Sequence, residues 1–174
     1  MQSQEYRQLS SSLKDNLSRL MELRSTWESH WQEVSDLVLP RKAEITKERQ
    51  RGDKRNVQIF DATAVHALEL LSASLHGMLT SSANRWFSLR FKENSLNDND
   101  EAKEWLEDAT ESMYVAFARS NFQQEIFESY HDLIAFGTAC LLIEEDKEDI
   151  LRFSARHIKE LYIQENDKGF VDTV

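Results

Sequence analysis

The first 39 residues contain neither glycine nor proline, and their apolar side chains recur at spacings of three, four and seven. Such spacing places side chains on one stripe of a helix. The stripe consists of Leu13, Leu17, Leu20, Trp27, Trp31, Val34 and Val38. Pro40 ends the pattern, because the residue before a proline is pushed out of helical geometry. The sequence therefore predicts one amphipathic helix from about Glu5 to Leu39, roughly 50 Å long.

Helix breakers are scarce along the whole chain, with 4 glycines and 1 proline in 174 residues. Long uninterrupted elements are therefore expected, and the apolar share of 40% is enough for one core. The predicted fold class is mainly α with small β elements (α+β), with a helical core and short strands or hairpins. We expect one domain overall, consisting of a long helix (1–40), a basic loop (41–60) and a helical domain (61–174).

Residues 62–80 are apolar or small at nearly every position. Asp61 precedes them and is a good N-cap, since its carboxylate can accept hydrogen bonds from the first free amides. The polar residues fall on one narrow strip of the helix, and they are His66, Glu69, Ser72 and His76. We therefore expect this helix to be buried on most of its circumference and to form the centre of the domain.

Beyond residue 80 the period of the pattern changes several times. Alternation over Trp86–Phe91 predicts a half-buried strand. Two helices are expected next, one over about 99–118 with Trp105 and Met113 inward, and one that starts after Ser120 and Asn121 and ends at Gly137. The remaining expected elements are a hairpin of residues 138–143 and 150–153, a helical turn near 156–160, and strands at 161–163 and 170–174.

The net charge of −10 is unevenly distributed and argues against nucleic acid as the partner of the whole surface. Residues 41–56 carry a local charge of +4, and residues 93–111 carry −7. Oppositely charged blocks on one chain can meet across a repeated subunit contact, although solvated loops and helix faces are the simpler explanation of each block. The candidate basic contacts, to a subunit or to phosphate, are Arg41, Lys42, Lys47, Arg49, Arg51, Lys54 and Arg55. The candidate acidic contacts are Asp98, Asp100, Glu101, Glu104, Glu107 and Asp108.

No motif in the sequence is typical of an enzyme, so we predict no catalytic residue, cofactor, metal or small-molecule substrate. Neither a nucleophile elbow nor a glycine-rich phosphate loop is present. Cys140 is the only cysteine, and no apolar stretch approaches the length of a membrane span. A metal site of His66, Glu69 and His76 is the alternative, but one helix alone supplies too few ligands, which favours a solvated or interface strip.

Several runs, in order, resemble the podovirus type of phage portal protein, also called the head-to-tail connecting protein. The match extends over about residues 20–174. The runs are Val38-Leu39-Pro40-Arg41, Asp61-Ala62-Thr63-Ala64, Ala73-Ser74-Leu75-His76-Gly77-Met78-Leu79-Thr80, Trp86-Phe87-Ser88-Leu89, Ser120-Asn121-Phe122, Ala135-Phe136-Gly137-Thr138-Ala139 and Leu161-Tyr162-Ile163 with Gly169 and Val171.

The resemblance implies a structural virion protein, one subunit of a ring of typically twelve at a capsid vertex. DNA is packaged and ejected through such a ring, on which the terminase motor, the capsid and the tail proteins dock. Assembly would take place in the host bacterial cytoplasm, without a membrane. Because complete portals are several times longer, this chain is expected to be the front portion, a wing-like region. The alternative is a helical interaction or scaffold module that uses the Leu/Trp stripe of residues 13–38.

Overall fold

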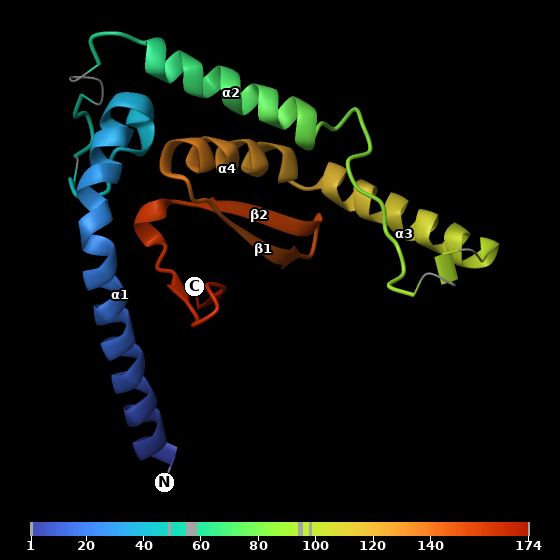
Figure 1. The fold of residues 1–174 in the computed structure, drawn as a ribbon, viewed down its shortest axis with the longest axis horizontal. Helices are drawn as coiled ribbons and strands as arrows, with labels where there is room; N and C mark the ends of the chain where they lie inside the picture. The colour runs from blue at the N-terminus through green and yellow to red at the C-terminus, as the bar shows by residue number, and fades with distance from the viewer. Residues whose placement is uncertain (1, 49, 55–58, 94–95, 98, 174) are drawn as a thin grey trace. The chain divides into compact units, whose positions relative to one another are not determined.

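The computed structural model describes residues 2–48, 50–54, 59–93, 96–97 and 99–173 (Figure 1). The chain divides into two compact units, residues 1–65 with 157–174, and residues 66–156. In chain order the elements are α1 (Gln2–Val38), η1 (Pro40–Lys42), α2 (Thr63–Leu79), α3 (Asp100–Arg119), α4 (Phe122–Phe136), β1 (Cys140–Asp146), β2 (Ile150–Arg156), η3 (Ile158–Glu160), β3 (Gln164–Glu165) and β4 (Val171–Thr173). The predicted class, mainly α with small β elements, is confirmed.

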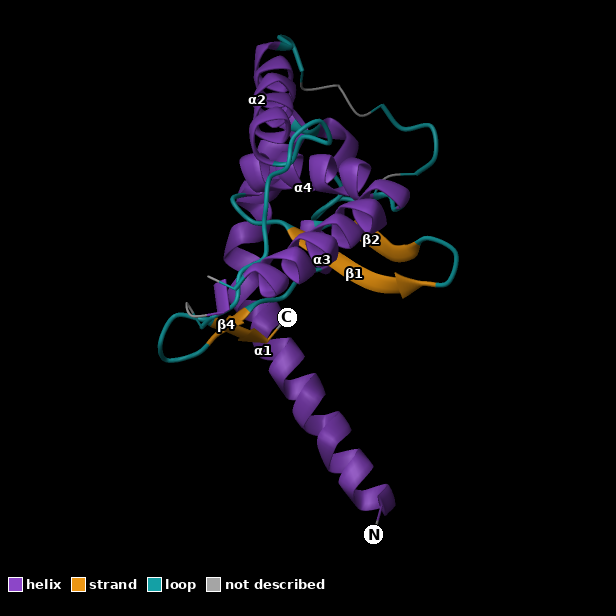
Figure 2. Cartoon of the chain, turned by 90° about the vertical axis from the view of Figure 1, so that its right-hand side faces the viewer, coloured by secondary structure: helices purple, strands orange, loops and turns teal. Residues whose placement is uncertain are grey.

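The strands form two small antiparallel sheets, β1 with β2 and β3 with β4 (Figure 2). The first is the predicted hairpin, and its register pairs Ile143 with Phe153. The second sheet lies later in the chain than expected, because residues 161–163 are not a strand and the pairing begins at Gln164. The helical turn expected near residues 156–160 is present as η3.

In the first unit, a buried glutamine on α1 holds the chain that follows the helix. The helix ends at Val38, before Pro40 as predicted. Gln32 Nε2 donates to the carbonyl of Ala43 at 2.9 Å, and Gln32 Oε1 accepts from the amide of Thr46 at 2.8 Å. Ala43 and Ile45 are buried against this end of the helix. The expectation of an exposed loop is therefore wrong for these two residues, because one side chain supplies their backbone with partners.

The middle of α1 is joined to residues 157–162 by Arg24. Its Nη1 donates to the carbonyl of Lys159 at 2.8 Å and to that of Leu161 at 3.0 Å. Its guanidinium also lies over the ring of Tyr162, 3.9 Å from the centroid. Leu20 and Leu161 are both buried in this region. Towards the N-terminus the apolar stripe is uncovered, and Leu13 is 62% exposed.

In the second unit, α4 and the β1–β2 hairpin form the core. Phe122, the first residue of α4, lies 4.8 Å from Phe117 and 5.1 Å from Phe153 between ring centroids. The Trp86 ring stacks on Phe122, with 5.7 Å between the ring centroids. Phe153 is only 2% exposed. The end of α3, the start of α4 and the middle of β2 thus meet in one aromatic cluster.

The junction between α3 and α4 is held to the hairpin by Asn121. Its Nδ2 donates to the carbonyl of Phe153 and its Oδ1 accepts the amide of the same residue, both at 2.8 Å. The Asn121 side chain makes no cap hydrogen bond, and the Ser120 hydroxyl accepts the amide of Phe122 instead. The helix ends at Gly137 as predicted, with φ of 74° and its N–H bound to the carbonyl of Leu133.

Helix α2 begins where predicted, but its apolar face is exposed instead of buried. Asp61 accepts hydrogen bonds from the hydroxyl of Thr63 at 2.8 Å and from its amide at 3.0 Å, and these bonds hold the pKa of the Asp61 carboxyl below its usual value. Within α2, however, only Leu68 and Ser72 are buried. Leu71 is 47% exposed and Met78 is 73% exposed. The prediction that this helix is the buried centre is therefore wrong, because its polar strip faces α4 and most of its apolar side chains face away.

Replacing Phe153 with alanine is expected to lower the free energy of unfolding by about 3–5 kcal/mol, the usual cost of truncating a buried aromatic residue. The matched control is Leu71→Ala, expected to cost less than about 1 kcal/mol because the side chain is half exposed. Urea denaturation of the 174-residue chain, followed by circular dichroism, measures both. A larger loss for Leu71→Ala would mean that α2 is the centre after all.

Candidate functional site

The predicted basic residues lie in the first unit, in η1 and in the loop after it. Arg41 and Lys42 belong to η1, whereas Arg49 and Arg55 lie outside the described residues. Lys47 Nζ lies 2.6 Å from Asp36 Oδ2, and that carboxylate is almost completely buried. Lys47 is therefore occupied in holding its own chain to α1.

Arg51 and Lys54 are exposed; Arg51 lies within a tight turn, and Lys54 directly follows it. The turn is closed by the amide of Gln50, which donates to Asp53 Oδ2 at 2.8 Å, and by the amide of Asp53, which donates to the carbonyl of Gln50 at 3.2 Å. A hydrogen-bonded turn presents these two cations to solvent on a defined backbone. They are the basic residues of the predicted set that are best placed to contact another molecule.

The predicted acidic residues lie in the second unit, along the first half of α3, except that Asp98 is outside the described residues. Asn99 caps the helix, and its Oδ1 accepts the amide of Glu101 at 2.9 Å. Asp100 and Glu101 stand in the first turn, where the helix dipole favours negative charge. Glu104 and Asp108 are exposed one and two turns further along.

Arg85, which was not among the predicted residues, neutralises part of this acidic face. Its guanidinium pairs with Glu107 and, at 2.6 Å, with Glu111. The hydrogen bond that Arg85 donates to Glu107 raises the pKa of Arg85 above its ordinary value. Glu107 is therefore committed within its own unit, whereas Glu101, Glu104 and Asp108 remain exposed. Contact between the acidic and basic blocks stays a prediction.

After Arg85 the chain runs beside α3 in an extended conformation without a strand partner, so the predicted strand over Trp86–Phe91 is wrong. The predicted alternation is nevertheless present, since Phe87, Leu89 and Phe91 are half-buried and Ser88 and Arg90 are exposed. Side chains replace the missing strand. Tyr114 Oη accepts the amides of Trp86 and Phe87 at 2.7 and 2.8 Å and donates to the carbonyl of Phe87.

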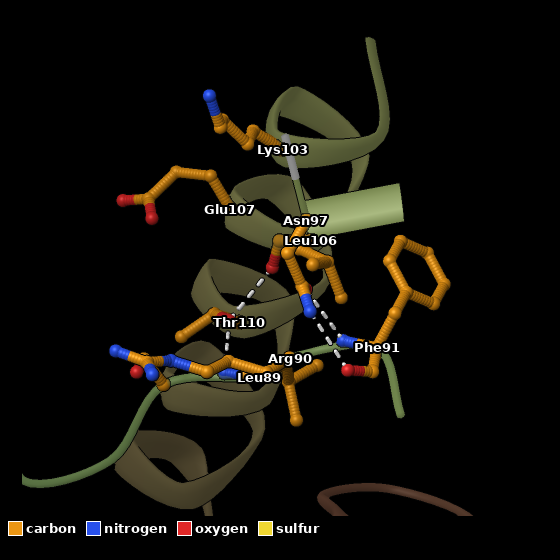
Figure 3. Close-up of a pocket in the computed structure, with 9 residues that line it drawn as sticks. Leu89, Arg90, Phe91, Asn97, Lys103, Leu106, Glu107 and Thr110 are labelled. Atoms are coloured by element: carbon orange, nitrogen blue, oxygen red, sulfur yellow. Dashed lines mark hydrogen bonds between the residues drawn. The ribbon is translucent and has the colours of Figure 1, made fainter. Parts of the chain in front are cut away.

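The end of this segment borders a pocket of about 630 Å³, drawn in Figure 3. One wall is Ser88–Phe91, and the other is α3 from Lys103 to Thr110. The Asn97 amide clamps both backbone groups of Phe91 at 2.9 Å. The Thr110 hydroxyl donates to the carbonyl of Leu106 at 2.7 Å. Two polar side chains of the pocket, Asn97 and Thr110, therefore bind backbone groups.

The polar strip of α2 meets α4 through His131, which is completely buried. Its Nε2 lies 3.0 Å from Glu69 Oε2, and its Nδ1 lies 3.0 Å from the carbonyl oxygen of Phe127. Both neighbours are oxygen atoms that can accept, so whichever ring nitrogen carries the proton has a hydrogen-bond partner. Thr80 adds a second link, because its hydroxyl lies 3.0 Å from Tyr130 Oη. The strip is thus an interface, one of the two interpretations favoured from the sequence.

A metal site of His66, Glu69 and His76 finds no support in this geometry. Glu69 is bound to His131, and the His76 ring packs edge-on against Phe127. Among the described residues, no three histidine, cysteine, aspartate or glutamate side chains lie close enough together to hold a metal ion. In the same part of the chain, no helix has both the length and the apolar character needed to cross a membrane.

Comparison with known proteins gives one consistent result. The sequence model of the family described as bacteriophage head to tail connecting protein matches residues 10–174. The chain is 35% identical over 162 residues to the probable portal protein of Bordetella phage BPP-1, and 33% identical over 162 residues to the portal protein of Salmonella phage epsilon15. These alignments cover 91% and 92% of this chain but 29% of each relative.

Replacing Tyr114 with phenylalanine is expected to lower the free energy of unfolding by about 1–3 kcal/mol, because it leaves the amides of Trp86 and Phe87 without their acceptor. Hydrogen exchange at these two amides should become faster. Tyr6→Phe is the control, since that ring is mostly exposed. Unchanged exchange at residues 86 and 87 would contradict the role given to the hydroxyl.

Proposed function

The chain belongs to the bacteriophage head to tail connecting protein family, and from that membership we propose that it is part of a portal subunit. The match over residues 10–174 is the observation that carries this proposal. Because the chain spans 29% of the length of the curated relatives it matches, ring formation and the partners of the whole protein belong to the proposal. The portal would be a homo-oligomeric ring, typically of twelve copies, at one vertex of the capsid.

The role proposed for the ring is structural, as a passage for DNA during packaging and ejection and a platform for other proteins. The terminase motor, the capsid and the tail proteins are the proposed partners, and the virion is the proposed location after assembly in the host cytoplasm. The side chains at the pocket and at the α2–α4 interface support a non-enzymatic role. Asn97 and Thr110 at the pocket bind backbone groups, and Glu69 and His131 pack between α2 and α4.

Closed rings of the full-length protein are the first expected outcome. Negative-stain electron microscopy should show particles with a central channel, and analytical ultracentrifugation should give a mass several times that of the subunit. A full-length protein that stays monomeric at micromolar concentration would contradict the proposal, since a portal acts only as a closed ring.

Reversing the charge of Arg51 and Lys54 to glutamate is expected to weaken ring assembly of the full-length protein while leaving its melting temperature nearly unchanged. Both side chains are exposed, and exposed ion pairs contribute about 0–1 kcal/mol each. Lys47→Glu is the matched control, and it should lower the melting temperature because it places a second carboxylate beside buried Asp36. Rings that form normally in the Arg51/Lys54 variant would show that the basic turn is only solvated.

A further inference from the structure

The outward face of α2 is a regular apolar seam with nothing packed on it in the described structure. Its members recur at alternating spacings of three and four, as in a coiled coil, and all are exposed. They are Ala64, Ala67, Leu71, Ser74 and Met78. The charged or titratable residues of the helix, His66, Glu69 and His76, lie off this seam. A neutral face of this kind disfavours a charged partner, because burial would strip the charge of water.

The N-terminal half of α1 carries a second seam of the same kind. Leu9, Leu13 and Leu17 follow one another at spacings of four, and all three are exposed. Gln8–Leu13 contains no charged residue. The other helices fit α2 less well. The exposed apolar residues of α3 stand among carboxylates, and α4 is largely buried, with Leu133 as its large exposed apolar residue.

We propose that the α1 seam of one copy packs on the α2 seam of the next copy in the portal ring. The proposal rests on the proposed function, because a closed ring needs a contact between two different surfaces of identical chains. The two seams are two such surfaces. Residues 9–17 of α1 form about two and a half helical turns and residues 64–78 of α2 about four, so the α1 seam fits within the length of the α2 seam.

The two seams also complement each other in side-chain size. On α2 the small side chains of Ala64, Ala67 and Ser74 lie beside Leu71 and Met78, whereas α1 presents leucines. Large side chains on one helix fit the spaces beside small side chains on the other, and this brings helix axes close together. Both seams are uncharged, so the contact buries apolar area without the cost of burying an unpaired charge. Unlike the charged blocks, such a contact should persist at high salt.

Cross-linking between copies tests the contact in the full-length protein, with Cys140 replaced by serine throughout. One tagged copy carries Leu13→Cys, and a second, differently tagged copy carries Leu71→Cys; the two are co-expressed. Both positions are exposed, so both variants should fold. A disulfide requires Cα atoms roughly 4–7 Å apart. We expect dimers that contain both tags to be the main cross-linked product, also in 0.5 M salt.

The control pairs Leu71→Cys with Lys14→Cys, which neighbours Leu13 but points about 100° away around the helix. It should give little dimer. Equal dimer from both pairs, or none from Leu13→Cys with Leu71→Cys, would overturn the proposed contact. So would a disulfide that forms only when both cysteines are on one chain. Electron microscopy of the unmodified protein separates the two proposals. Rings together with no disulfide between Leu13→Cys and Leu71→Cys would contradict the contact alone. The absence of rings would contradict the proposed function.

Discussion

The two hydrogen bonds between Asn121 and the backbone of Phe153 fix how the second unit is built. They bring the break between α3 and α4 onto the middle of β2, so that Phe117 and Phe122 meet Phe153 in one cluster. Without this pair, the aromatic rings would have no fixed register against the hairpin. The directional polar contact thus sets the geometry, and burial of the rings supplies most of the free energy.

Side chains that hydrogen-bond to the backbone of a distant segment occur elsewhere in the chain too, because the described sheets are small. A two-stranded sheet provides partners for few backbone groups, and a buried backbone group without a partner is costly. Gln32 binds the backbone of the chain after α1, and Asn97 binds the backbone of Phe91. Tyr114 accepts hydrogen bonds from the amides of Trp86 and Phe87. Single polar side chains on or beside helices therefore supply the backbone hydrogen-bond partners that neighbouring strands supply in a larger sheet.

This pattern explains what the sequence could and could not predict. The helices and the β1–β2 hairpin follow from local periodicity, and Pro40 and Gly137 mark helix ends through backbone geometry alone. The role of Asn121 was not predictable, since an asparagine before a helix reads as a cap unless its distant partner is known. For Tyr114, the one available signal was a polar pair with Thr110, one turn apart on the inward side of α3.

Helix α2 shows a further limit of periodicity. Its pattern distinguishes an apolar face from a polar strip, but it does not say whether the apolar face meets the same chain or another surface. Here the polar strip meets α4 through Glu69 and His131. For the predicted charged residues, the sequence located the blocks but could not show that Lys47 and Glu107 already have partners within their own units.

The outward apolar face of α2 also bears on the timing of protein production. Until another surface covers this face, every newly folded copy exposes an uncharged apolar helix to the other copies in the cell. Productive association and irreversible aggregation then compete for the same surface, and the concentration of uncovered chains decides between them. Rapid covering of α2 would therefore raise the yield of usable protein.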